Sequence, residues 1–130
     1  MTPDPSLNAV PDDGLVHLSL PATPRYLAAA RVVATSLGAE SGLTVDDLDD
    51  LRLGVNELVS ALVEASTAGE RVELEFGVAG SRVTVRGRRS GGPARPIELD
   101  ELTTRIVEAV ADEHSIDGSS FTISKASSIS

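Results

Sequence analysis

The chain has 130 residues, of which 41% are hydrophobic and only 2% aromatic, and its formal net charge is −9 at pH 7. This length suits one domain with an aliphatic core, and the negative charge argues against nucleic acid as a partner, because binding phosphates requires basic patches. The absence of cysteine excludes disulfides, thiolate zinc sites and thiol nucleophiles.

The first 14 residues are rich in proline and acidic side chains, and we expect them to form a disordered leader. They contain no apolar run, so the sequence predicts neither a signal peptide nor a membrane span, and a cytoplasmic protein is the default expectation. The globular domain is expected to cover residues 15–126, followed by a short tail at 127–130.

A strand and a helix are predicted at the start of the domain. Residues 15–20 alternate between apolar and polar side chains, which is typical of a half-buried strand, and Pro21 ends it. Pro24 is a typical first residue of a helix. We expect this helix to run to about Leu37 and to end at Gly38, because glycine is common just beyond a helix end.

The segment from Thr44 to Ala65 gives the strongest helix signal in the chain. Its apolar residues recur every three or four positions and form one stripe along a helix: Leu48, Leu51, Val55, Leu58 and Leu62. Thr44 is a typical N-cap residue with Asp47 three positions further on, and acidic side chains suit the positive end of the helix dipole. The sequence therefore predicts a long, well-capped central helix.

Beyond Gly69 the period of the apolar residues changes to two. Residues 71–76 and 82–86 alternate in this way on either side of a turn, and they predict a β-hairpin with one solvated face. Residues 87–96 are rich in glycine and arginine and predict a loop by composition.

The end of the domain adds a helix and a strand. A third helix is expected to begin at Asp100 or Glu101, and residues 119–125 alternate as a last strand. The resulting order β-α-α-β-β-α-β predicts an α+β two-layer sandwich, in which a mostly antiparallel sheet carries helices on one face.

The stretch DDLDDLRLGVNELVSALVEA at residues 46–65 resembles the long helix of the anti-sigma-factor serine kinases, a family of the GHKL ATPase superfamily with the Bergerat nucleotide-binding fold. A looser resemblance extends over residues 15–125. The resemblance implies a role in bacterial transcription regulation, because this family sequesters a sigma factor and phosphorylates a serine on a small antagonist protein with ATP and magnesium.

The resemblance also identifies where this chain departs from the family. It places the general base at Glu57 and the magnesium-binding asparagine at Ala61, which has no side-chain oxygen. The family aspartate that recognises adenine follows the second hairpin strand, where this chain has Gly87, Arg88 and Arg89. The family's phosphate-binding glycines before the last helix are absent here, and the lid segment is short.

These departures favour a degenerate, kinase-dead relative that binds no cofactor and no metal. We expect a non-catalytic regulatory domain that binds a sigma factor, an antagonist protein or a related domain. The alternative is an active serine-protein kinase that uses ATP and magnesium through divergent motifs. Glu57 is then either the vestige of the base or simply a solvated glutamate on a helix flank.

Arginines are the candidate partner-binding residues. The resemblance places Arg31 where family members contact a protein partner, and the alternative is a surface arginine lying over apolar neighbours. Arg88 and Arg89 belong to a run of basic residues between Arg86 and Arg95. This run is expected to be either a solvated loop or a docking surface for an acidic partner.

Two further expectations concern assembly and metals. The resemblance implies a homodimer, and the short first strand offers an unpaired edge that a second copy could cover. His17 and His114 have no partner at ligand spacing, so the sequence predicts no histidine metal site.

Overall fold

The computed structural model describes residues 15–92 and 95–129, and the expected leader at 1–14 lies outside this range. Five strands form one sheet in the order β1-β2-β3-β5-β4, with every neighbouring pair antiparallel. The strands are β1 (Val16–Pro21), β2 (Arg71–Ala79), β3 (Arg82–Ser90), β4 (Glu113–Asp117) and β5 (Ser120–Ala126). The helices are α1 (Leu27–Glu40), preceded by a 3-10 turn at Pro24–Tyr26, α2 (Val45–Glu64) and α3 (Glu101–Val110).

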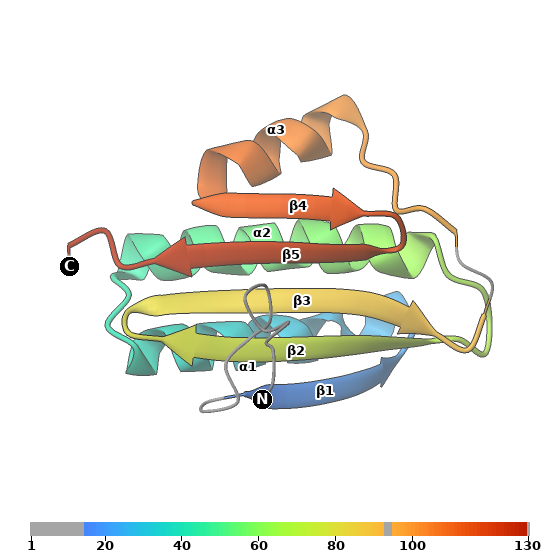
Figure 1. The fold of residues 1–130 in the computed structure, drawn as a ribbon, viewed down its shortest axis with the longest axis horizontal. Helices are drawn as coiled ribbons and strands as arrows, with labels where there is room; N and C mark the ends of the chain where they lie inside the picture. Colours follow the sequence, from blue (N-terminus) through green and yellow to red (C-terminus); the bar gives the residue numbers. More distant parts are fainter. Residues whose placement is uncertain (1–14, 93–94, 130) are drawn as a thin grey trace, which may run out of the picture.

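The helices form the second layer of the molecule (Figure 1). α1 packs against β2 and β3, α2 packs against β3 and β5, and α3 packs mainly against α2. This arrangement confirms the predicted α+β sandwich with an antiparallel sheet and helices on one face.

The core lies between the sheet and α2. The apolar stripe of α2 is buried against the inward-facing residues of the strands, and the largest buried side chains include Leu51, Leu58, Leu62, Phe76 and Phe121. The period of 3.6 in the helix and the period of two in the strands produce these two matching apolar surfaces.

The first helix extends beyond its predicted end. It continues through Gly38 to Glu40, because Gly38 is a packing residue rather than a terminator. A Cβ atom at this position would lie 2.7 Å from Leu48 Cδ2 and 3.2 Å from Leu43 Cδ2. The glycine therefore lets α1 approach the start of α2 closely.

The prediction of a loop at 87–96 was wrong for residues 87–90, because β3 continues to Ser90. Gly87 pairs with Leu74 on one side and with Phe121 on the other. A Cβ atom on Gly87 would lie 2.5 Å from the Phe121 ring, so this glycine makes room for a core aromatic side chain.

β4 was not predicted, because its residues are mostly polar and it lies at the sheet edge. The signal that could have revealed it is the short turn at Gly118, whose φ of 63° favours glycine.

Residues 127–129 are attached to the domain, although the sequence suggested a tail. Ser127 is buried, and its N–H donates to the Ser81 carbonyl at 2.9 Å. The N–H and hydroxyl of Ser128 both donate to Asp47 Oδ2, at 3.0 and 3.2 Å. Asp47 also completes the capping box with Thr44, and these hydrogen bonds, led by the one from the Ser128 N–H, lower the pKa of Asp47 to about 2.

Replacing Gly87 with alanine should lower the free energy of unfolding by about 1–3 kcal/mol, because the added methyl group overpacks the core beside Phe121. Urea unfolding followed by circular dichroism measures this effect. Thr84→Ala, on the same strand, serves as the control and should change stability by less than about 0.5 kcal/mol. Equal effects of the two substitutions would contradict the packing role of Gly87.

Candidate functional site

Ala61 lines a surface hollow at the C-terminal end of α2. Its volume is about 470 Å³, and its lining residues are Ala61, Glu64, Ala65, Ser66, Thr67, Arg95, Pro96 and Glu98. Glu57 lies one helical turn before Ala61 and is half-buried, but it is not among the lining residues. The position that the resemblance assigns to the metal ligand therefore lies in the lining of the hollow, and the position that it assigns to the base does not.

A buried carboxylate, that of Glu70, lies beside this hollow. The side chain of Glu70 is 3% exposed, and it accepts hydrogen bonds from the Thr67 N–H and the Thr67 hydroxyl, each at 3.0 Å. Arg95 Nη2 donates to both Glu70 oxygens, at 3.1 and 3.2 Å. The pKa of Glu70 lies below its usual range, mainly because of the Thr67 N–H and, to a lesser degree, the Thr67 hydroxyl and the Arg95 guanidinium.

Two guanidinium groups meet at the end of α2. Arg95 Nε donates to the Ala65 carbonyl at 2.8 Å, and Arg89 Nη1 donates to the same carbonyl at 3.3 Å. Arg89 Nη2 donates to the Arg95 carbonyl at 2.7 Å, and Arg89 Nε lies 3.7 Å from Glu70 Oε1. Positive charge at this position is favourable, because the last carbonyls of a helix carry the negative end of its dipole.

The prediction that Arg88 and Arg89 lie together on an exposed loop was wrong. Alternation along β3 places Arg89 on the helix side of the sheet, where its side chain is 3% exposed, whereas Arg88 is exposed. In this structure the Arg89 side chain is therefore not accessible to a partner. Continuing the period of Val83 and Val85 would have placed Arg89 inside.

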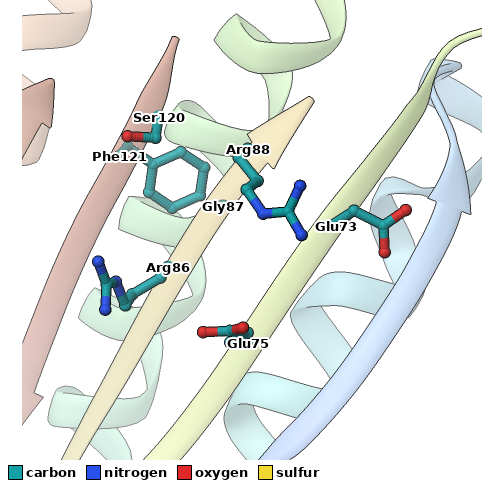
Figure 2. A pocket seen from close by; sticks show the side chains of 7 residues that line it. All are labelled: Glu73, Glu75, Arg86, Gly87, Arg88, Ser120 and Phe121. Atoms are coloured by element: carbon teal, nitrogen blue, oxygen red, sulfur yellow. The ribbon is translucent and has the colours of Figure 1, made fainter. Parts of the chain in front are cut away.

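Arg88 lies on the open face of the sheet, beside acidic residues. Figure 2 shows its side chain extending towards Glu73 in front of the strands, with the helices behind them. Arg88 pairs in register with Glu73, and Arg86 pairs with Glu75, around a shallow hollow of about 290 Å³. Positive and negative side chains thus alternate on this face, which does not form a purely basic patch.

Arg31 is held by α2. Its Nη1 donates to Asn56 Oδ1 at 2.7 Å, so the side chain has a defined position rather than lying loosely on apolar neighbours. It lines a third hollow of about 490 Å³ between α1 and α2, together with Asp49, Asp50, Arg52, Leu53 and Asn56. Arg31 and Arg88 therefore belong to opposite faces of the molecule and do not form one surface.

The hollow at Ala61 is lined by side chains of both charges. Ala61 has no side-chain oxygen, whereas Glu64 and Glu98 supply carboxylates and Arg95 supplies a guanidinium group. Within residues 15–92 and 95–129, no group of three or more His, Asp or Glu side chains could hold a metal ion. None of the helices in this described part of the chain is long and apolar enough to cross a membrane.

Comparisons with known proteins agree with this geometry at the level of the fold. A family model of the histidine kinase-like ATPase domain matches residues 20–118. The serine-protein kinase RsbW of Bacillus velezensis is 29% identical over 73 residues, which are 54% of this chain and 46% of that protein. The crystal structure of the RsbU and RsbW domains of a Mycobacterium tuberculosis protein superposes with a TM-score of 0.60 at 20% identity, covering 87% of this chain and 32% of that one. The matches thus span less than half of each relative's length.

Replacing Glu70 with glutamine should destabilise the domain at neutral pH, because the two arginines lose their carboxylate partner. The folded-state pKa of Glu70 lies below its usual value of 4.5, so its stabilisation is present above pH 4.5 and is lost as the pH falls through the lowered pKa. The difference in melting temperature between the wild type and Glu70→Gln should therefore shrink below pH 4.5.

Thermal unfolding over a pH series measures this difference. Glu108→Gln, at an exposed position of α3, is the control and should leave the melting temperature nearly unchanged at every pH. A difference for Glu70→Gln that stays constant below pH 4.5 would show that its carboxylate charge is not what stabilises the cluster.

Proposed function

The chain belongs to the family of histidine kinase-like ATPase domains, and on this basis we propose that it is a regulatory protein-binding domain that has lost nucleotide chemistry. The observation that carries this proposal is Ala61, which occupies the position that the resemblance assigns to the magnesium-binding asparagine and has no side-chain oxygen. The resemblance to the anti-sigma-factor serine kinases supplies the class of partner, which is a sigma factor, an antagonist protein or a related domain.

In this proposal Glu57 is a vestige of the family's base. It keeps the base position on α2 and is half-buried. A general base acts only on a substrate that is held within hydrogen-bond reach, and Ala61 cannot help to hold the metal that would position one.

An active serine kinase is the second candidate function. It is favoured by the similarity to RsbW, which is named as a serine-protein kinase. Nucleotide binding discriminates between the two functions, because the kinase requires ATP and magnesium and the protein-binding domain does not.

We expect no measurable affinity for ATP or ADP in magnesium buffer. Titration calorimetry at high protein concentration tests this expectation, and saturable binding in the micromolar range would overturn the proposal of a kinase-dead domain. Ala61→Asn alone should not restore binding, because the adenine-recognising aspartate and the phosphate-binding glycines of the family are also missing from this sequence.

The partner surface that we propose lies around Arg31, between α1 and α2. Two large apolar side chains, Val32 on α1 and Leu53 on α2, are exposed on these helices. The hydrogen bond to Asn56 fixes the position of the Arg31 guanidinium before a partner arrives. A preorganised charge beside exposed apolar groups is typical of interface residues.

Reversing the charge at Arg31 should slow association with a partner captured from cell extract, by about tenfold at low salt, and the difference should shrink as salt is added. Surface plasmon resonance measures both rates. Arg105→Glu, an exposed charge reversal on α3, is the matched control. Arg88→Glu tests the open face of the sheet separately. If neither Arg31→Glu nor Arg88→Glu changes the affinity at low salt, the partner binds elsewhere.

The homodimer remains a proposal. Within the described residues β1 pairs with β2 and forms one edge of the sheet, so its outer side is open to a second copy of the chain. Sedimentation velocity at micromolar concentration tests the proposed homodimer, and a monomer under these conditions would contradict it.

A further inference from the structure

Residues 95–100, which lead into α3, have no regular secondary structure but are packed into the domain. Ile97 is 6% exposed and belongs to the core. Its N–H donates to the Gly118 carbonyl at 2.9 Å, which joins this segment to the turn between β4 and β5. A segment without helix or strand hydrogen bonds requires other contacts to hold it in one position.

Arg95 provides such contacts at the start of this segment. Its guanidinium reaches the Ala65 carbonyl and both oxygens of Glu70, and its own carbonyl accepts from Arg89 Nη2. The cluster of Glu70, Arg89 and Arg95 thus joins the end of α2, the residue before β2, the end of β3 and residues 95–100.

The charges of this cluster are matched to its surroundings. Burying a charge is costly unless it is paired and hydrogen-bonded, and Glu70 and Arg89 are both almost fully buried. Two arginines face one carboxylate, and the remaining positive charge lies at the negative end of the α2 dipole. The rigid, planar guanidinium groups also restrict the directions of their hydrogen bonds, whereas contacts between apolar side chains are not directional.

We propose that the cluster of Glu70, Arg89 and Arg95 holds residues 95–100 in one position without a bound ligand. Guanidinium groups of the chain itself, rather than a nucleotide, hold residues 95–100 against the end of α2 and give the wall of the hollow at Arg95 and Pro96 a permanent shape. This inference rests on the proposed function, and it adds that partner binding is not switched by nucleotide.

Amide hydrogen exchange at Ile97, measured by NMR on the full chain, tests the proposal. Arg95→Gln keeps a polar side chain but removes the charge and the hydrogen bonds from Nη2 to both Glu70 oxygens, so exchange at Ile97 should become about tenfold faster. Arg95→Lys retains the charge but has no second nitrogen to donate to the Ala65 carbonyl, so it should give an intermediate rate. Arg88→Gln, on the exposed face of β3, is the matched control and should leave the rate unchanged.

Millimolar magnesium-ATP is added in a parallel experiment to separate the two proposals. In the wild type the exchange rate at Ile97 should be the same with and without ATP. Slower exchange with ATP would overturn both the proposed loss of nucleotide binding and this inference. An Ile97 rate that is insensitive to ATP and also unchanged in Arg95→Gln would overturn this inference alone.

The substitutions are chosen so that misfolding does not obscure the result. Arg95 is 34% exposed, so it tolerates replacement better than the buried Arg89. Exchange at Leu58, in the middle of α2, reports on global unfolding in the same spectra. Faster exchange at Ile97 with unchanged exchange at Leu58 supports the proposal, whereas an equal increase at both residues shows general destabilisation and contradicts it.

Discussion

The fold depends on the burial of one face of α2 between the sheet and the other two helices. α2 contacts α1, α3, β3 and β5. Its leucines contribute on the order of 2 kcal/mol each when fully buried. Gly54 allows the closest approach, because a Cβ atom there would lie 2.5 Å from Ile123 Cδ1 on β5. The positions of Arg31, Ala61 and the end of α2 all follow from this packing.

Much of the fold could be predicted because the strong periodic patterns and the structure agree. The central helix and the β2–β3 hairpin each bury many apolar side chains, so local pattern and tertiary packing favour the same state. The errors lie where packing overrides composition. Gly87 looked like a loop residue, but it is a strand residue that accommodates Phe121, and Gly38 looked like a helix end, but it is a contact with Leu48.

The candidate site could be predicted in part. The spacing of Glu57 and Ala61 on one helix is local information, and of these two residues only Ala61 lines the hollow at the end of α2. The cluster beside it could not be found in this way. Glu70, Arg89 and Arg95 lie up to 25 residues apart in the sequence and belong to different elements, so no local spacing links them. Composition indicated a solvated basic run, whereas burial depends on which strand face Arg89 occupies.

The attachment of Ser128 to Asp47 also has a consequence for biosynthesis. The N-terminal end of α2 gains its last hydrogen bonds from a residue 81 positions later in the chain. β5, which contributes Phe121 and Ile123 to the core, lies between β3 and β4 in the sheet. Neither contact can form while these residues are still inside the ribosomal tunnel. A nascent chain that already contains α1, α2 and the first hairpin therefore keeps part of the apolar stripe of α2 uncovered until β5 and Ser128 have left the tunnel, and apolar surface exposed in this way favours aggregation.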